Sequence, residues 1–453
     1  MSTAFPRRRT VPSGAVHRST WIHVFQAAAA LAAGMGVGRF VYTPILPLMH
    51  AQAGLSAGNG ADLATANYVG YLAGALLGIV LPRLTRSPAV LRGSLLVMTA
   101  ALAAMPSTHS TAVWLALRLF AGAASALIFV ITVSSLLGRL RGHSAHLVGW
   151  AFGGVGAGIA LSGLLVLILR SLADWRAAWW ASAGLAALLT AASWTLRPEP
   201  APQAGPAAPT DPASQLEPAT RSESAPRPDP APRPDPAPRP DPASRPDPAP
   251  RPGASAGEQV SGPRTHRWFT ALFASYTLEG IGYIIAGTFL VAAVEQGSPG
   301  WIGGCAWVLV GLAAVPSSAF WAWSGRRWSR PDLLIAALAV QAVGIALPAL
   351  IGGVAAALLS ALLFGATFLG VSTITLAAGA HLRFPRSVAL LTAGYSVGQI
   401  LGPLAVTPLL HHGYHQALLL AAVVVLAAAT AAAVLRVGFP HHMPALGHPA
   451  PRS

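Results

Sequence analysis

Three charged side chains stand deep inside apolar segments of this sequence: Arg39, Arg118 and Glu279. A guanidinium group can hold a carboxylate or a phosphate through two parallel hydrogen bonds. A glutamate can take up and release a proton, whereas an arginine stays charged under physiological conditions. Charges at membrane depth are costly, and they commonly mark the path of an ion or a solute. These residues therefore predict an anion site beside a proton carrier.

The two halves of the sequence resemble each other around these charges. GVGRFVYTPIL at 36–46 aligns with GIGYIIAGTFL at 280–290, and FAGAASALIFVIT at 120–132 can be set against FGATFLGVSTIT at 364–375 with one gap. Two similar six-helix units around an axis along the membrane normal place a binding site near the midplane, where the units meet. The repeat predicts a site between the two halves of the chain.

The alignment also places Arg39 relative to Glu279. Arg39 is equivalent to Tyr283 and Met35 to Glu279, and the spacing of four within each segment puts both positions on one helix face. If both helices turn this face to the axis, Arg39 and Glu279 point into one cavity and can form an ion pair. A permanent pair that only neutralises two charges is the alternative, but apolar residues could replace such a pair without loss of stability. We therefore expect solute binding at Arg39 to change the protonation of Glu279.

Hydrogen-bonding side chains from neighbouring segments complete the predicted cavity. They are Tyr42, Asn67, Tyr68, Tyr71, Tyr283, Tyr395 and Gln399, for which ordinary packing is the alternative interpretation. Arg118 lies in LRLFAGAASA, where small residues allow helices to approach closely. It is expected either to anchor an anion or to hydrogen-bond neighbouring helices.

Glycine rows predict helix faces that are nearly bare. The rows comprise Gly36 and Gly38, then Gly149, Gly153, Gly154 and Gly158 in GWAFGGVGAG, and Gly394, Gly398 and Gly402, followed by Pro403, in GYSVGQILGP. Such faces permit tight contact and sliding between helices, although static packing produces the same pattern.

The composition shows which elements must position these residues. Hydrophobic residues make up 54% of the chain, charged residues 9%, and the mean hydropathy is +0.56. Soluble domains carry about 25% charged residues, so the sequence predicts an all-α polytopic membrane protein with helices of about 20 residues. The predicted spans are 21–49, 64–82, 89–106, 111–138, 144–170, 175–197, 267–294, 301–323, 332–351, 353–379, 387–411 and 414–437.

The net charge of +15 comes from 29 arginines and no lysine, most of them in short loops on one side of the predicted helices. An excess of basic residues in alternate loops indicates that those loops face the cytoplasm. We therefore expect both termini to be cytoplasmic in a bacterial inner membrane. The pattern excludes a nucleic-acid partner, because no basic stripe with interleaved aromatic residues is present.

The spans divide the chain into five regions. They are a cytoplasmic tail at 1–20, a six-helix bundle at 21–197, a Pro-rich linker at 198–263, a second bundle at 264–437 and a tail at 438–453. The linker repeats APRPDP, which favours an extended, disordered spacer, with a docking ligand for another domain as the alternative. The lone Cys305 allows no internal disulfide, and HHGYH at 411–415 is expected to be a turn rather than a metal site. No metal or cofactor is predicted.

Several segments resemble one known family. Twelve spans in two halves, RLFAG in the fourth span and the glycine-rich fifth and eleventh spans are similar to the major facilitator superfamily (MFS). GMGVGRFVYTPILPLM, ANYVGYLAGALLG and YTLEGIGYIIAGTFL resemble its YbfB/YjiJ-type branch of permeases. LPRLTRSPAVLRG keeps the basic residues of the loop between spans 2 and 3 but lacks the usual aspartate. The fifth span lacks the proline of antiporters.

These features together predict a secondary active transporter and not an enzyme, because no cluster of His, Asp or Glu stands near a membrane face. We expect it to move a small organic solute, of negative charge if Arg39 is the anchor, by alternating access with proton coupling, and to act as a monomer in the lipid bilayer. A drug or metabolite efflux antiporter is the alternative within the class. A non-transporting sensor or a membrane-embedded enzyme is the alternative outside it.

Overall fold

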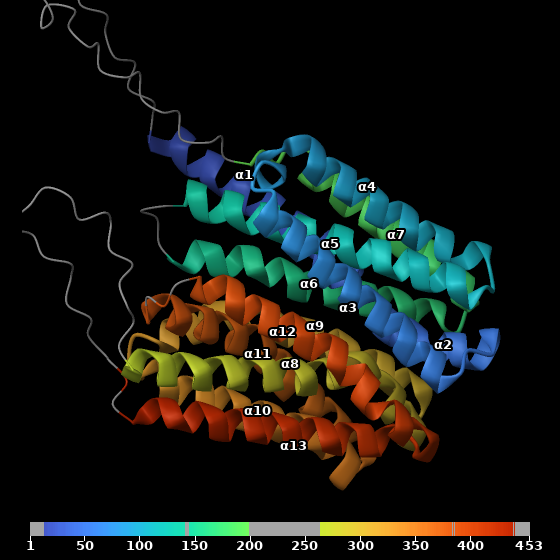
Figure 1. Cartoon of the computed structure of the whole chain (residues 1–453). Coiled ribbons are helices and arrows are strands. Elements are labelled where there is room, and N and C mark those ends of the chain that lie inside the picture. The colour runs from blue at the N-terminus through green and yellow to red at the C-terminus, as the bar shows by residue number, and fades with distance from the viewer. Residues whose placement is uncertain are drawn as a thin grey trace, which may run out of the picture. The chain divides into compact units, whose positions relative to one another are not determined.

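The chain folds into helices that run back and forth between two ends (Figure 1). The computed structural model describes residues 13–140, 145–198, 263–382, 384, 386–437 and 439. The predicted linker and C-terminal tail lie almost wholly outside these ranges. The first helix begins at Ser13, inside the segment predicted to be the N-terminal tail.

The helices form two bundles within one compact unit. The first bundle consists of α1 (Ser13–Leu31), the π-helical turn η1 (Ala32–Val37), α2 (Tyr42–Ala53), α3 (Ala57–Val80), α4 (Pro88–Ala104), α5 (Thr111–Arg139), α6 (Ala145–Leu169) and α7 (Trp175–Ser193). The second consists of α8 (Pro263–Gly297), α9 (Gly300–Ser324), α10 (Arg330–Leu350), α11 (Gly353–His381), α12 (Ser387–Val406) and α13 (Tyr414–Ala433). Short 3-10 turns extend some helix ends, among them η5 (Thr407–His412) and η6 (Val434–Arg436). This arrangement confirms the predicted all-helical fold in two six-helix bundles.

Eleven segments of the described chain are long and apolar enough to cross a membrane. The sixth predicted span, α7, has 19 residues and is not among them, although it packs beside α4 in the first bundle (Figure 1). Trp175, Arg176, Trp179 and Trp180 lower its mean hydropathy. The chain is therefore a multi-pass membrane protein whose sixth crossing is the least apolar.

Local signals explain where several helices begin and end. Ser56, Ser87, Asp174 and Ser329 precede α3, α4, α7 and α10, and each side chain accepts a hydrogen bond from a backbone N–H at the start of its helix. Gly54 ends α2 with φ of 68°, a left-handed conformation that favours glycine. These caps fix the turns between crossings.

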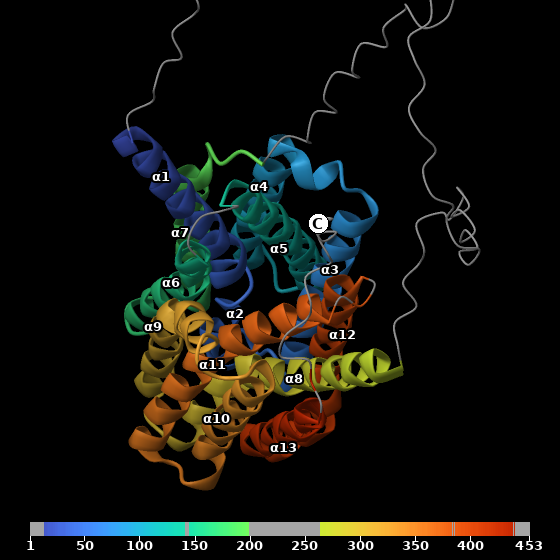
Figure 2. The same ribbon diagram turned by 90° about the vertical axis from the view of Figure 1, so that its left-hand side faces the viewer.

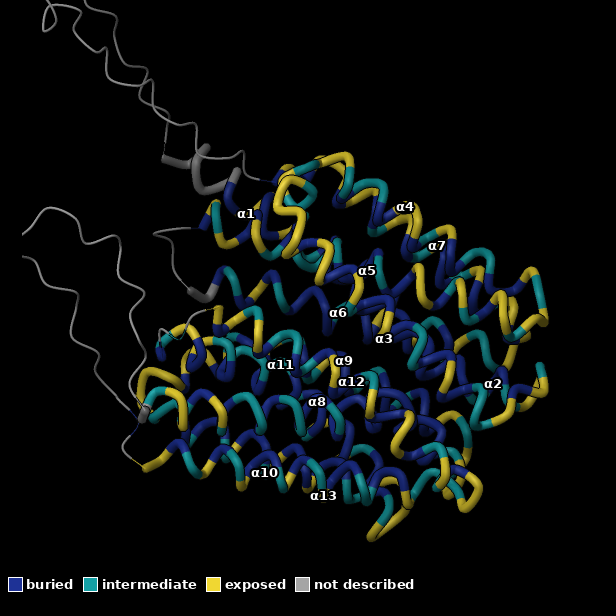
Figure 3. Tube along the Cα trace, in the orientation of Figure 1, coloured by how far each residue is buried: buried dark blue, intermediate teal, exposed yellow. Residues whose placement is uncertain are grey.

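Spans 1 and 7 lie at the centre of the structure. In each of them 83% of the most apolar stretch is buried, compared with 39% in the span at Pro88–Ser107 (Figure 3). Outward faces of other helices expose large apolar side chains, including Val80 and Leu188. An apolar exterior suits hydrocarbon, so the two central spans are the ones shielded from lipid.

The first span is broken, although the sequence predicted one continuous helix. The α-helix stops at Leu31, η1 and a turn occupy residues 32–41, and α2 resumes the crossing at Tyr42. Close packing accompanies the break: a Cβ on Gly36 would lie 2.5 Å from the Cα atom of Gly158. Because π-helical turns occur mostly as local distortions at functional sites, this break marks the region around Arg39.

The glycine rows of α6 pack on two different partners. A Cβ on Gly154 would lie 2.2 Å from a backbone oxygen of α1, and one on Gly158 2.5 Å from a backbone oxygen of η1. Gly149 and Gly153 instead face the backbone of α9, in the other bundle. One helix thus holds the first bundle together and also joins it to the second.

The row Gly394, Gly398 and Gly402 has its partner inside its own bundle. A Cβ on Gly398 would lie 2.3 Å from the backbone oxygen of Thr277 in α8. Pro403 is buried within α12. Seen from the end that carries α1 and the start of α8, α6 lies beside α9 and α3 beside α12 (Figure 2). These two helix pairs form the sides of the contact between the bundles.

Candidate functional site

Arg39 lies in the break of the first span, and its guanidinium reaches the second bundle. The side chain is 3% exposed, and Nη2 donates a hydrogen bond to Gln399 Oε1 of α12. The guanidinium carbon lies 4.3 Å from the ring centroid of Tyr71, 4.9 Å from that of Tyr68 and 5.5 Å from that of Phe40. Its Nε has no hydrogen-bond partner. A buried cation therefore sits in an aromatic cage with one donor left unused.

Glu279 is fully buried in α8 and faces its own bundle. Its Oε1 accepts a hydrogen bond of 3.3 Å from Gln341 Nε2 of α10, while Oε2 has no partner. The expected ion pair with Arg39 is not formed, because each charge is bound to a neutral glutamine amide instead. The geometric argument for the pair assumed a continuous helix at Arg39, and the break in the first span removes that assumption. Gln341 was missed by the sequence analysis, although a lone amide in an apolar span is a signal that could have found it.

Tyrosines of the second bundle lie between the two charges. Tyr395 stacks on Tyr276 with 4.3 Å between ring centroids and on Tyr283 with 5.8 Å. Tyr283 lies one helical turn after Glu279 on α8, and Tyr395 lies one turn before Gln399, the partner of Arg39, on α12. The structure therefore brings the two charges near a shared layer of phenol groups without direct contact. We call Arg39, Tyr68, Tyr71, Tyr283, Tyr395 and Gln399 the Arg39 cluster.

Arg118 supports the break and does not face the Arg39 cluster. Its guanidinium donates to the backbone oxygens of Gly38 and Arg39, at 3.4 and 3.3 Å, and lies over the Tyr42 ring. Asn67 donates to the backbone oxygen of Arg118 at 2.9 Å. Arg118 thus satisfies carbonyls that lie beyond the end of regular helix, in keeping with the helix-bonding interpretation rather than the anion-anchor one.

Some of the remaining predicted polar residues lie inside the first bundle, and others lie at the contact between the two bundles. The Tyr42 hydroxyl donates to the Gly60 backbone oxygen at 2.8 Å inside the first bundle. The Tyr68 hydroxyl is 2.8 Å from Thr288 Oγ1 of α8, across the contact. Tyr42 and Asn67 therefore belong with Arg118, whereas Tyr68 belongs to the Arg39 cluster.

A set of bridges that the sequence analysis missed connects the bundles beyond Arg39, toward the end at which α2 terminates. Arg170 forms an ion pair of 2.7 Å with Glu295, near the end of α8, and His50 Nε2 lies 2.7 Å from the hydroxyl of Tyr414. Thr43 Oγ1 donates to a backbone oxygen of α8 at 2.5 Å. These bonds, the Tyr68–Thr288 bond and the Arg39–Gln399 bond all lie between Arg39 and this end. We call it the bridged end, and the other the arginine-rich end.

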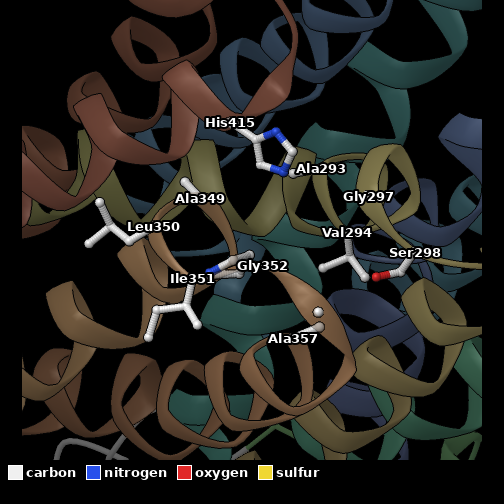
Figure 4. Close-up of a pocket in the computed structure, with 12 residues that line it drawn as sticks. Ala293, Val294, Gly297, Ser298, Ala349, Leu350, Ile351, Gly352, Ala357 and His415 are labelled. Atoms are coloured by element: carbon white, nitrogen blue, oxygen red, sulfur yellow. The ribbon is translucent and has the colours of Figure 1, made fainter.

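Two pockets, one between the ends of α8 and α10 and one between α4 and α7, lie away from the Arg39 cluster. The first lies at the bridged end, where the ends of α8 and α10, the start of α11 and His415 of α13 line it (Figure 4). Its other lining groups are mostly apolar, and it contains no residue of the Arg39 cluster. Within the described residues, no three His, Cys, Asp or Glu side chains are grouped so that they could hold a metal ion.

Comparisons with known proteins agree on the fold. The model of a family described as "Uncharacterised MFS-type transporter YbfB" matches residues 31–223 and 243–433. The crystal structure of a mutant nucleoside transporter NupG superposes with a TM-score of 0.62 at 13% sequence identity, covering 91% of this chain and 99% of that one. No curated protein matches the sequence. At such low identity the structural match establishes the fold alone.

Proposed function

We propose that this chain, which belongs to the family of the uncharacterised MFS-type transporter YbfB, carries a small organic anion across the bacterial inner membrane by alternating access coupled to protons. The chain is a membrane transporter of a small solute. The observation that carries the finer proposal is the buried Arg39 guanidinium, held between the two bundles on a neutral amide. Solute binding at this point would act directly on the contact between the bundles.

Arg39 is suited to exchange its partner. A carboxylate can accept two parallel hydrogen bonds from a guanidinium and carries the opposite charge, whereas the neutral Gln399 amide accepts one bond and carries no charge. A carboxylate could also use Nε, which has no partner at present. An anion would therefore displace the Gln399 amide and release α12 from the broken span.

The bridges suggest which side would open. Ties between the bundles extend from Arg39 to the bridged end, whereas the arginine-rich end is joined through the packing of α6 on α9. By the positive-inside rule, the arginine-rich end would face the cytoplasm. The described state would then exchange solute with the cytoplasm, and transport would require the bridges to break.

Glu279 would carry the proton. Its Oε2 is buried without a partner, so the carboxyl group has room for a proton or for a new contact. Tyr276, Glu279 and Tyr283 share one face of α8, and Tyr395 stacks on both of these tyrosines. A rearrangement of the Arg39 cluster on solute binding would therefore reach the surroundings of Glu279 and alter whether it holds a proton.

The test uses purified protein in liposomes that contain a pH-sensitive dye. Monocarboxylates, amino acids and sugars are added singly, with protein-free liposomes as the control for passive entry of weak acids. We expect a carboxylate to acidify the interior only when the protein is present. Glu279→Gln should abolish acidification yet keep exchange of labelled for unlabelled solute, because exchange needs no net proton movement.

Arg39→Lys separates bidentate binding from simple charge, because an ammonium group does not reproduce the planar fork of a guanidinium. We expect this variant to lose both exchange and acidification. Full activity of Arg39→Lys would contradict the anchor. Unchanged acidification by Glu279→Gln would contradict the proton carrier.

A further inference from the structure

The surroundings of Arg39 are almost entirely aromatic. Three rings, those of Phe40, Tyr68 and Tyr71, enclose the guanidinium from the first bundle. Phe40 in turn contacts Phe368 of α11 edge-on, at 6.3 Å between centroids. A solute held by Arg39 would therefore have its body against ring faces and edges rather than aliphatic side chains.

The second bundle presents a layer of rings with nearly parallel planes. The Tyr283 ring makes angles of 13° with Phe368, 17° with Phe364 and 19° with Tyr395. Tyr395 is half-buried and lies one helical turn before Gln399 on α12, so both share a helix face. A group that displaces the Gln399 amide would thus extend along this layer.

The charges and donors near Arg39 limit what the solute can be. Arg118 is buried inside the first bundle with both terminal nitrogens on backbone oxygens, and Glu279 is engaged with Gln341. Among these three groups, Arg39 is the cation that reaches the contact between the bundles, and its Nε has no partner. The phenol hydroxyls of Tyr71, Tyr283 and Tyr395 could accept or donate a few hydrogen bonds. One cation and a few phenols suit a single negative charge, and they cannot satisfy the many hydroxyls of a sugar.

We infer that the solute is a planar aromatic monocarboxylate, bound with its carboxylate on Arg39 and its ring against the layer of Tyr283 and Tyr395. This inference rests on the proposed function and specifies its substrate class. Stacked aromatic pairs contribute beyond the area that they bury, whereas a saturated ring of similar size gains only burial. The aromatic layer is therefore the part of the site that selects among monocarboxylates.

Equilibrium binding to the purified full-length protein tests the inference, with labelled benzoate as the probe. Unlabelled benzoate, cyclohexanecarboxylate, terephthalate and benzamide are the competitors. We expect cyclohexanecarboxylate to compete about three- to tenfold more weakly than benzoate, the range that stacking supplies. Terephthalate, with a second charge, and benzamide, with none, should compete more weakly still.

Tyr283→Leu removes the ring but keeps an apolar side chain. We expect it to bring the benzoate and cyclohexanecarboxylate affinities together. Phe129→Leu is the matched control, because the Phe129–Phe152 pair lies between α5 and α6, outside the Arg39 cluster, and its loss should leave the ratio unchanged. If Tyr283→Leu does not fold, Tyr395→Leu serves the same purpose.

The outcomes separate the two proposals. Equal competition by benzoate and cyclohexanecarboxylate, abolished by Arg39→Lys, would overturn the aromatic selection and leave the anion transporter standing. A ratio that stays the same in the Tyr283 and Tyr395 variants would also overturn it. Monocarboxylate binding that survives Arg39→Lys unchanged would overturn the anchor, and both proposals with it.

Discussion

The first and seventh spans are related by the sequence repeat, yet they cross the membrane in different ways. α8 runs unbroken from Pro263 to Gly297, whereas the first span divides into α1, η1 and α2 around Arg39. Both are equally buried, and both have glycines one and three residues before Arg39 and its equivalent, Tyr283. Neither burial nor glycine content therefore accounts for the difference.

A difference in neighbours does account for it. The repeat sets Phe120 against Phe364, which makes Leu362 the counterpart of Arg118 in the alignment, although Leu362 is exposed on the outside of its bundle and Arg118 is buried. Arg118 supplies donors to two carbonyls at the break, and a leucine can supply none. Because a carbonyl without a partner is costly inside a membrane, the backbone can leave the regular helix only where such a donor is present. The comparison shows that a buried arginine can donate hydrogen bonds to the backbone of another helix instead of binding a solute.

Blocking the close approach at the break should have the largest effect. In Gly36→Val, the added side chain would meet the backbone of Gly158, which cannot move away as a flexible side chain could. We expect a loss of more than about 3 kcal/mol of folding free energy, at the upper end for overpacking. The measurement is the yield of monodisperse protein by size-exclusion chromatography.

A matched control for this variant is Gly184→Val in α7, where an added Cβ would meet nothing within 4 Å. It should be recovered in normal yield. Normal recovery of Gly36→Val would show that the break does not depend on this contact.

Making the first bundle resemble the second should have the next largest effect. Arg118→Leu copies Leu362 and leaves the backbone oxygens of Gly38 and Arg39 without their donor. Each carbonyl left unpaired costs about 1–3 kcal/mol, partly offset by removal of a buried charge, so we expect a net loss of about 2 kcal/mol. Thermal unfolding in detergent measures it, and an unchanged Tm would contradict the support role.

This comparison also shows how far the sequence could predict the molecule. Apolar runs and arginine-rich loops gave the twelve helices and the two bundles, because helix length and hydropathy are local properties. The chemical role of Arg118 depended on which backbone carbonyls lie opposite its side chain. The partner of Glu279 likewise depended on which side chain of another helix, here Gln341, lies opposite it. Such partners are set by packing between segments that are far apart in the sequence. The predicted direction of the Arg39 side chain assumed a regular helix, so it was wrong where the helix is broken.

The two glutamines sharpen the comparison further. Gln399 binds the charge of the broken span across the bundles, and Gln341 binds the charge of the continuous span within one bundle. Gln399→Leu removes the amide that competes with an anion for Arg39, so we expect benzoate affinity to rise about tenfold, the value of one charge-assisted hydrogen bond. Gln341→Leu should leave that affinity unchanged. Equal effects of the two variants would show that the amide on Arg39 is not a competitor.

The smallest effect is expected where the continuous span is tied to the first bundle by a partly exposed ion pair. Glu295→Gln removes the carboxylate that Arg170 holds, while Arg170 keeps its bond to the backbone oxygen of Gly300. Exposed pairs contribute about 0.2–1 kcal/mol, so stability should fall by less than 1 kcal/mol, and the difference from the parent should shrink at high salt.

The transport rate distinguishes this tie from an ordinary surface pair. If the bridges must break in each cycle, Glu295→Gln should shift the population toward states that are open at the bridged end, by up to about fivefold for 1 kcal/mol. Arg436→Gln is the control, because the Arg436–Asp332 pair lies within the second bundle and crosses no contact. If both variants change the transport rate by the same factor, the Arg170–Glu295 pair is not a tie that must break during transport. The broken span would then remain as the part of the bundle contact that moves.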